Sequence, residues 1–221
     1  MANTNKNIFN NFSFSKKYKK ELIEFFKNNT TIEAGGNLLF DGEYNYPLQI
    51  PEEFADLIFE LKKSNKKNKL KIFLEIGFGH GYTNTILNKF FNFDVNCAID
   101  TFGPHINGNT LLPNLRFKNL NLICQNSKSK NTKNILKKFG KFDLILIDAD
   151  HGYNSAKNDF ELSLEITHKN SIIIVHDIKL KNSGSKKLWE ELKKIKKYNL
   201  KEIYCNKYQF KYGVGILKFK N

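Results

Sequence analysis

Arginine is nearly absent from this 221-residue chain, although its formal net charge is +14 at pH 7. Lysine and arginine together number 36, and Arg116 is the only arginine among them. Because the planar guanidinium fork grips phosphates and reads guanine, this shortage disfavours a nucleic-acid-binding surface. The lysines are spread along the whole chain, which predicts a solvated cationic coat in place of one basic patch.

Long apolar runs and paired cysteines are also missing. No stretch of about 18 apolar residues occurs, which disfavours a transmembrane helix. The segment from Met1 to Asn11 lacks the apolar core of a secretory signal. The three cysteines are scattered and do not have the spacing of metal ligands, so we interpret them as reduced. These absences predict a cytoplasmic protein without membrane contact, and the length suits one domain with a substantial core.

Three glycines at alternating positions form the most informative stretch of the sequence. A short apolar strand runs into Gly77, Gly79 and Gly81 before helix-forming sequence resumes at Tyr82. Glycine permits a tight bend there and lets a ligand lie against bare backbone, while the next helix presents unpaired N–H groups. The third glycine comes one residue too early for the G-x-G-x-x-G loop of dinucleotide-binding proteins. A glycine-rich turn without a ligand is the alternative.

Apolar strands alternate with amphipathic helices along the chain. The expected strands are 72–76, 95–99, 120–124, 142–147, 171–175, 200–205 and 212–219, and the expected helices are 16–28, 51–64, 82–91, 130–139, 155–166 and 184–197. The first five strands are apolar, which suits a parallel sheet buried on both faces, and the last two suit a hairpin. The prediction is an α/β, Rossmann-like fold: a seven-stranded, mostly parallel sheet with helices on both faces and a C-terminal antiparallel hairpin.

Further expectations concern the two ends of the chain. Residues 1–15 are rich in asparagine and are expected to be loosely ordered. Residues 1–65 lie outside the expected core, and we interpret them as a helical extension that serves as a substrate lid or as a contact in a homo-oligomer. The core domain then spans 66–221. The core face of the last helix is expected to consist of Trp189, Leu192 and Ile195.

Polar residues follow the ends of the predicted strands. Asp100 ends the second strand about 20 residues past the glycines, where an acid accepts hydrogen bonds from both hydroxyls of a ribose. Capping of the next turn is the alternative for Asp100. Because neighbouring parallel strands deliver their last residues to one crevice, we expect acids and histidines to converge beside the glycine loop. The residues that follow strands four and five are Asp148, Asp150, His151, His176 and Asp177.

These motifs resemble the class I S-adenosylmethionine (SAM) methyltransferases. Glu75 and the three glycines that follow it resemble motif I of that class. The runs 142–153 and 172–177 look like methyltransferase family 24, and they are similar to cephalosporin-hydroxylase-like and sugar O-methyltransferases; the run 49–53 fits the same branch. Relatives often hold the adenine amine with an acid after strand three, where this chain has Asn126. The resemblance implies a SAM-binding domain at 66–221 with a cofactor site made of Glu75, Gly77, Gly79, Gly81, Asp100, Asn126, Ser127 and Asp148.

The resemblance also implies a metal site. In relatives that bind a divalent metal, an aspartate after strand four and an acidic pair after strand five hold the ion. The matching positions are Asp148, His176 and Asp177. His176 departs from that pattern, because magnesium favours oxygen ligands and imidazole suits softer metals. Metal-assisted and metal-free transfer therefore both stay open, with Asp148 facing SAM and Asp177 capping a turn in the metal-free case.

A hydroxyl acceptor fits the residues after strand four. The sulfonium of SAM already activates the methyl group, so the protein must align an acceptor oxygen and remove its proton. His151 has a suitable pKa for a general base, with Asp150 as its orienter or as an alternative base. No Asn-Pro-Pro-Tyr motif of amine methylation occurs there. The expected activity is O-methylation of a small or sugar-like acceptor; an NAD-dependent oxidoreductase and a nucleic-acid-binding module are the alternatives.

Overall fold

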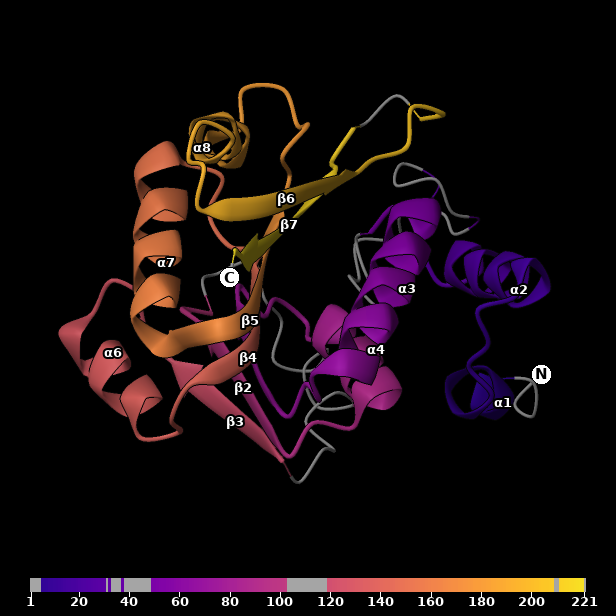
Figure 1. The fold of residues 1–221 in the computed structure, drawn as a ribbon, viewed down its shortest axis with the longest axis horizontal. Coiled ribbons are helices and arrows are strands. Elements are labelled where there is room, and N and C mark those ends of the chain that lie inside the picture. Colours follow the sequence, from indigo (N-terminus) through magenta and orange to yellow (C-terminus); the bar gives the residue numbers. More distant parts are fainter. Residues whose placement is uncertain are drawn as a thin grey trace.

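A seven-stranded sheet forms the centre of the computed structural model, which describes residues 5–30, 32, 37, 49–102, 119–208 and 211–220. Its strands are β1 (Ile72–Ile76), β2 (Val95–Asp100), β3 (Leu120–Cys124), β4 (Phe142–Ile147), β5 (Thr167–His176), β6 (Tyr198–Ile203) and β7 (Val214–Phe219). They lie in the order β3-β2-β1-β4-β5-β7-β6 (Figure 1). The first five are parallel, and β7 runs antiparallel to both of its neighbours. The predicted fold class is confirmed, including the C-terminal hairpin.

Helices cover both faces of this sheet (Figure 1). They are α1 (Asn5–Asn10), α2 (Lys16–Lys27), α3 (Pro51–Lys67), α4 (Tyr82–Phe91), α6 (Lys130–Lys137), α7 (Tyr153–Ile166) and α8 (Gly184–Leu192). Helices α3 and α4 lie on one face, with α1 and α2 outside them, and α6, α7 and α8 lie on the other. Successive β4 residues supply the two cores in turn: Leu144 and Leu146 face α3, whereas Ile145 and Ile147 face α7.

The sequence explains where α2 and α3 begin and which faces they bury. Ser15 caps α2, because its side chain accepts a hydrogen bond from the backbone N–H of Tyr18. Tyr18, Leu22 and Phe26 repeat every fourth residue and are buried, and burying such side chains contributes about 1.5–3 kcal/mol each. Pro51 occupies the first turn of α3, where no N–H is needed. Helix α3 ends at Lys67, one turn beyond the prediction.

The expectation of a loosely ordered segment is wrong for residues 5–15, because α1 forms within them, and residues 1–4 lie outside the described residues. Aromatic packing explains the difference. The ring centroid of Phe9 lies 5.5 Å from that of Phe25 and 4.9 Å from that of Phe90. Phe12 lies 5.1 Å from Phe59 in the same way. Scattered aromatic residues in an asparagine-rich stretch thus anchor it against α2, α3 and α4.

Helix α8 is shorter than predicted, since it ends at Leu192 and not near residue 197. Trp189 and Leu192 are buried as expected, but Ile195 is 38 % exposed and does not face the core. The chain must turn after Leu192 because Tyr198 is already buried in β6, where it pairs with Phe219. Pairing in the sheet therefore overrides the helical pattern of the lysine-rich run.

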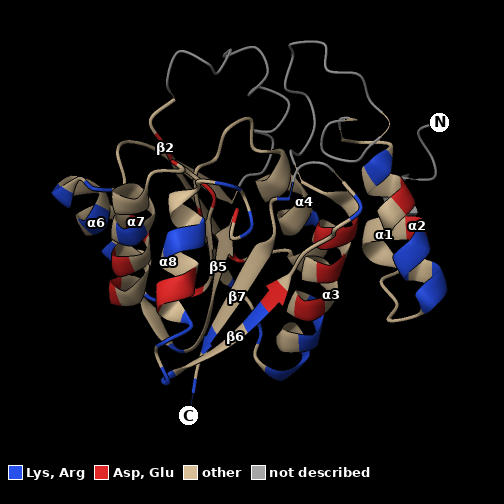
Figure 2. Cartoon of the chain, turned by 90° about the horizontal axis from the view of Figure 1, so that it is seen from above, with Lys and Arg blue, Asp and Glu red and all other residues tan. Residues whose placement is uncertain are grey.

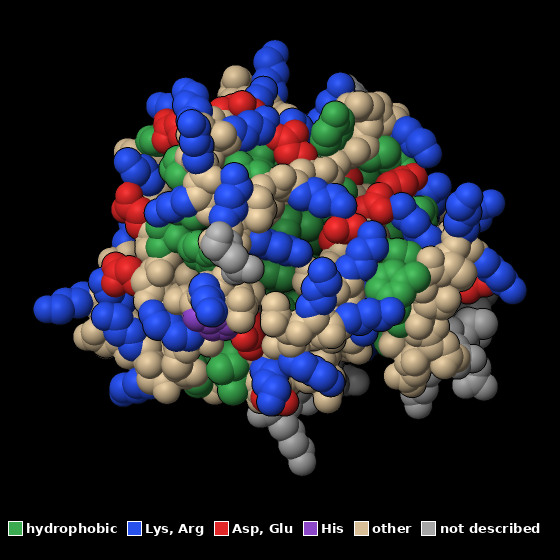
Figure 3. Space-filling view, viewed as in Figure 1, with side chains coloured by type: hydrophobic (Ala, Val, Ile, Leu, Met, Phe, Trp, Pro, Cys, Tyr) green, Lys and Arg blue, Asp and Glu red, His purple; other side chains and the backbone are tan. Residues whose placement is uncertain are grey.

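Lysines are dispersed over the described surface. Figure 3 shows them across one whole face, with acidic side chains among them. Helices α2, α3 and α8 carry charges of both signs (Figure 2). Arg116 lies outside the described residues. Within the described part of the chain, no helix has the length and apolar character needed to cross a bilayer.

Candidate active site

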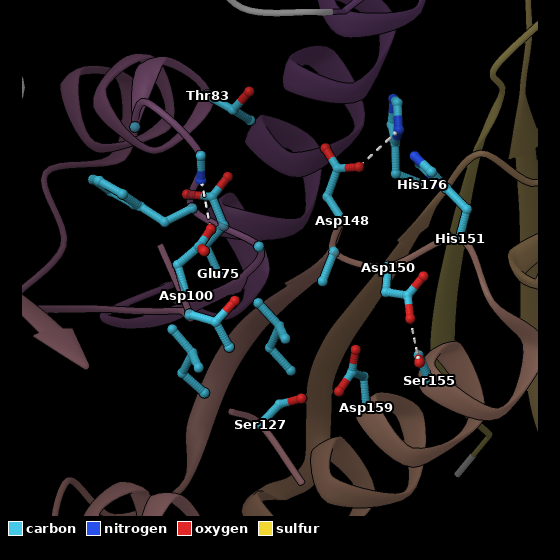
Figure 4. A pocket seen from close by; sticks show the side chains of 18 of the residues that line it. Glu75, Thr83, Asp100, Ser127, Asp148, Asp150, His151, Ser155, Asp159 and His176 are labelled. Carbon is cyan, nitrogen blue, oxygen red and sulfur yellow. Dashed lines mark hydrogen bonds and ion pairs between the residues drawn. The ribbon is translucent and has the colours of Figure 1, made fainter. Parts of the chain in front are cut away.

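The carboxyl ends of the central strands border one cavity of about 680 Å³, a volume typical of small-molecule sites. In Figure 4, Glu75 and Asp100 lie on one side of this cavity, and Asp148, His151 and His176 lie on the other. All residues that the sequence predicted for the site line it: Glu75, Gly77, Gly79, Gly81, Asp100, Asn126, Ser127, Asp148, Asp150, His151, His176 and Asp177.

Bare backbone of the loop after β1 faces the cavity. Gly77 has a φ of 94°, and a Cβ there would lie 2.1 Å from the carbonyl oxygen of Asp148. Only glycine therefore lets the loop pass against the end of β4. Gly79 has a φ of 53°, and an added Cβ would meet nothing within 4 Å. Open space beside exposed backbone is what a ligand lying along this loop requires.

Glu75 is a buried acid at the end of β1. Its residue is 1 % exposed, and its Oε2 has no hydrogen-bond partner among the described residues. Burial raises the pKa of Glu75 well above its usual value, and the negative charge of Asp148 adds to this effect. A cationic group of a ligand would supply the missing partner, which fits the methionine ammonium of SAM.

Asp100 holds the loop after β1 to the end of β2. Its Oδ2 accepts a hydrogen bond from the Gly79 N–H at 2.8 Å, and its Oδ1 accepts one from the Phe102 N–H at 2.8 Å. Each carboxylate oxygen has a second lone pair, so Asp100 keeps acceptor capacity for ligand hydroxyls. Asn126 is used differently, since its Oδ1 accepts a hydrogen bond from the Lys128 N–H at 2.9 Å and closes the turn after β3.

Asp148, His176 and Asp177 form a compact cluster at the ends of β4 and β5. The Nδ1 of His176 lies 3.0 Å from Asp148 Oδ1 (Figure 4). The same nitrogen lies 3.0 Å from Asp177 Oδ1. One ligand atom from each residue falls within 4.8 Å of the others. Asp177 also adopts a φ of 63°, in the left-handed region that residues other than glycine seldom occupy, although aspartate tolerates it better than most. The structure therefore brings together the three residues that the sequence predicted as metal ligands.

The polar atoms of this cluster lack sufficient partners. Both ring nitrogens of His176 and the Oδ1 of Asp177 are buried without a well-aligned hydrogen bond among the described residues. Burial alone would lower the pKa of His176, but the charges of Asp148 and Asp177 outweigh it and raise that pKa well above its usual value. Two carboxylates beside one imidazole are a donor set that fits a divalent transition metal.

His151 contacts Asp177, whereas Asp150, which the sequence analysis gave as its orienter or as an alternative base, bonds to other residues. The Nδ1 of His151 lies 2.9 Å from Asp177 Oδ2, and its side chain is 61 % exposed. The hydrogen bond to Asp177 raises the pKa of His151 above its usual value. Asp150 instead accepts hydrogen bonds from the Ser155 hydroxyl at 2.5 Å and the Gly152 N–H at 3.0 Å. These bonds occupy Asp150 at the start of α7.

Several residues that the sequence analysis gave no role also line the cavity, among them Gln49, Asp159 and Tyr212. The Gln49 Nε2 donates a hydrogen bond to Asp148 Oδ2 at 3.1 Å. The Tyr212 ring stacks on His176 with centroids 5.9 Å apart. Gln49 was the easiest to find, since it belongs to the run 49–53 that resembles the family. Nothing local in the sequence marks Asp159 or Tyr212.

The central part of the chain is similar to a known protein family. Residues 74–178 match the model of a methyltransferase domain, Methyltransf_24. These residues, a little under half of the chain, are thus similar to this methyltransferase family. The strand order and the glycine loop of the chain agree with this similarity and are those expected of the class I SAM-dependent methyltransferase fold. The alternative of an NAD-dependent oxidoreductase receives no support from the family match. A comparison with curated proteins gave no match.

Solved methyltransferases share the fold at low sequence identity. An O-methyltransferase from Bacillus cereus in complex with S-adenosylhomocysteine (SAH) is 14% identical, with 98% of this chain and 97% of that chain covered and a TM-score of 0.61. The O-methyltransferase TomG from Streptomyces achromogenes, in complex with SAM, is 14% identical, with 91% and 90% covered and a TM-score of 0.57. The N-methyltransferase NodS from Bradyrhizobium japonicum is 12% identical, with 76% and 97% covered and a TM-score of 0.56. These likenesses establish the fold for this chain.

Proposed function

We propose that this methyltransferase transfers the methyl group of SAM to a hydroxyl group of a small acceptor, with sugar-like molecules as the first candidates. One observation supports this most directly: a single cavity joins the glycine loop to the cluster of Asp148, His151, His176 and Asp177. A cofactor bound along the glycine loop and an acceptor bound at the cluster would therefore lie next to each other in this cavity. The solved relatives named as O-methyltransferases support the oxygen acceptor.

The cofactor would lie along the ends of β1, β2 and β3. Glu75 would hold the methionine ammonium, the backbone at Gly77 and Gly79 would lie against the body of the molecule, and Asp100 would accept hydrogen bonds from the ribose. When bound, SAM supplies a methyl group already activated by its sulfonium. The task of the protein is then to place an acceptor oxygen in line with that methyl group and to exclude water.

His151 is our candidate for the general base, and Asp177 is our candidate for its orienter in place of Asp150. The contact between His151 Nδ1 and Asp177 fixes the ring and leaves Nε2 available for the proton of the acceptor hydroxyl. A raised pKa makes the imidazole a stronger base, and Asp177 stabilises the imidazolium that forms. Asp177 itself stays ionised: burial opposes ionisation, but the charge of His176 keeps the pKa of Asp177 far below its usual value.

A divalent metal fits the cluster that Asp148, His176 and Asp177 form. These three residues would hold it, and the imidazole favours manganese, iron or zinc over magnesium. Such an ion would lower the pKa of an acceptor hydroxyl. Metal dependence is measured by adding each ion to the chelator-treated protein and following both binding and transfer.

The N-terminal part would border the acceptor. Gln49 lies two residues before the start of α3, and its side chain donates a hydrogen bond to Asp148. This part of the chain therefore contacts the candidate metal cluster directly. We propose that residues 1–65 close over the acceptor as a lid or provide a contact in a homo-oligomer. Helices α2 and α3 share an apolar cluster with β4 and β5, which holds this part of the chain against the sheet that carries the cavity.

Isothermal titration with SAH and with NAD tests the cofactor assignment. We expect SAH to bind and NAD not to bind; binding of NAD alone, or of neither, would overturn the proposal. The base is tested by transfer of labelled methyl groups from SAM to a panel of hydroxyl-bearing acceptors. His151→Ala should lose transfer by about 10²–10⁴-fold while it retains SAH affinity. Asp150→Asn is the matched control, and a larger loss there than in Asp177→Asn would restore Asp150 as orienter.

A further inference from the structure

Asp159 is a buried acid of the cavity that the mechanism above does not use. It lies on α7, its residue is 2 % exposed, and it lines the cavity beside Ser127 and Lys128. Figure 4 shows its carboxylate next to Ser127, and a hydrogen bond from the Ser127 hydroxyl satisfies part of it. Its Oδ1 has no hydrogen-bond partner within the described residues.

An unpaired carboxylate oxygen in a buried position is costly, so such a group normally has a donor. The nearby Lys128 Nζ donates a hydrogen bond to the Ser155 hydroxyl at 3.0 Å, and it makes none to the Oδ1 of Asp159. Burial raises the pKa of Asp159, which agrees with a group that lacks a sufficient partner. Among the described residues no donor reaches this oxygen, and an N–H group of a ligand in the cavity would supply one.

Strand order indicates which part of the cofactor lies there. In the sheet, β1, β2 and β3 are successive neighbours, and their ends carry Glu75, Asp100 and Ser127 in that order. A molecule with its ammonium at Glu75 and its ribose at Asp100 therefore has its base at Ser127 and Asp159. The edge of adenine carries a 6-amino group, which is an N–H donor.

The Oδ1 of Asn126 accepts the hydrogen bond from the Lys128 N–H that closes the turn after β3, whereas the Oδ1 of Asp159 accepts no hydrogen bond among the described residues. We propose that Asp159 determines the base specificity of the cofactor site, with its Oδ1 accepting a hydrogen bond from the 6-amino group of adenine. This inference rests on the proposed function, namely that SAM or SAH occupies the cavity.

A cycle that combines a protein substitution with a ligand change tests the inference. The ligands are SAH and its analogue in which hydrogen replaces the 6-amino group, and affinities are measured by isothermal titration. For the wild type, loss of the amine should weaken binding by about ten- to a hundredfold, as expected for a hydrogen bond to a charged group. For Asp159→Ala, the two ligands should differ by less than about threefold, because the acceptor is gone.

Asp159→Leu fills the space without an acceptor and gives the same expectation if the alanine variant does not fold. Glu161→Gln, an exposed site on the same helix, removes one negative charge as the control and should discriminate like the wild type. Equal discrimination by the wild type and both Asp159 variants would overturn the role of Asp159 while leaving SAM binding intact. Failure of the wild type to bind SAH at all would instead overturn the proposed function and this inference with it.

Discussion

Alanine substitutions at Gly77 and Gly79 separate the two demands on the loop after β1. Both glycines have positive φ, at 94° and 53°, but their surroundings differ. An added Cβ at Gly77 would lie 2.1 Å from the Asp148 carbonyl oxygen, which is backbone and cannot swing away. That backbone is fixed by a hydrogen bond from the Asp148 N–H to the Ile76 oxygen at 2.8 Å. At Gly79 the same Cβ enters open space.

The two variants should therefore differ in stability. Gly79→Ala carries only the cost of a left-handed conformation, about 1 kcal/mol. Gly77→Ala adds overpacking of about 1–3 kcal/mol to a backbone strain of about 1–3 kcal/mol, so we expect about 4 kcal/mol in total. At about 2–4 °C per kcal/mol for a chain of this size, Tm should fall by about 2–4 °C for Gly79→Ala and by about 8–16 °C for Gly77→Ala.

Ligand binding should be impaired by Gly79→Ala, although this variant keeps most of its stability. The methyl group of Gly79→Ala would occupy space that the cofactor needs, so SAH affinity should fall at least about tenfold although the fold is nearly unaffected. Thermal unfolding with and without SAH, followed by titration calorimetry, measures both effects. Equal Tm losses in the two variants, or wild-type SAH affinity in Gly79→Ala, would refute this account of the loop.

Two further predictions concern the support of the site. Glu53 accepts hydrogen bonds from the N–H groups of Cys205 and Gly213 at 2.7 and 3.0 Å, so Glu53→Ala should lower the free energy of unfolding by about 2–5 kcal/mol, and the adjacent Glu52→Ala by less, in urea titrations. Equal losses would contradict this. The second prediction concerns Glu202. Burial would raise the pKa of Glu202, but hydrogen bonds from lysine and tryptophan donors outweigh it and lower this pKa from 4.5 to about 2. Its contribution is present above about pH 4.5 and is lost as the pH falls, so the stability difference between wild type and Glu202→Gln should narrow from about pH 6 to about pH 3; a constant difference would contradict the shift.

The strands and the convergence of their ends could be predicted because both depend on local patterns. Apolar runs such as 142–147 define buried strands, and parallel strands always deliver their last residues to one edge. Contacts between distant side chains were beyond this reasoning. His151 has Asp150 beside it in sequence, yet it pairs with Asp177 because β4 and β5 are neighbours in the sheet. The orphaned Oδ1 of Asp159 likewise follows from how α7 packs, which no motif encodes.

Packing also decided the two errors in the helices. The polar composition of residues 1–15 hid a few aromatic side chains whose partners lie in α2 and α4. The lysine-rich run after Leu192 has helical periodicity, but the start of β6 is set by its pairing with β7. In both places tertiary contacts outweigh local propensity, which differs between such conformations by only about 1 kcal/mol per residue.

The position of α3 has a consequence for how such an enzyme diversifies. This helix is part of the apolar cluster beneath β4 and β5, while Gln49, just before it, touches the acid that ends β4. In the proposed enzyme the methyl donor and the methyl acceptor are thus served by separate stretches of one cooperative unit. In this proposal, substitutions ahead of α3 change which hydroxyl-bearing acceptor is bound and leave the cofactor site unchanged, provided that α3 itself stays packed in the core.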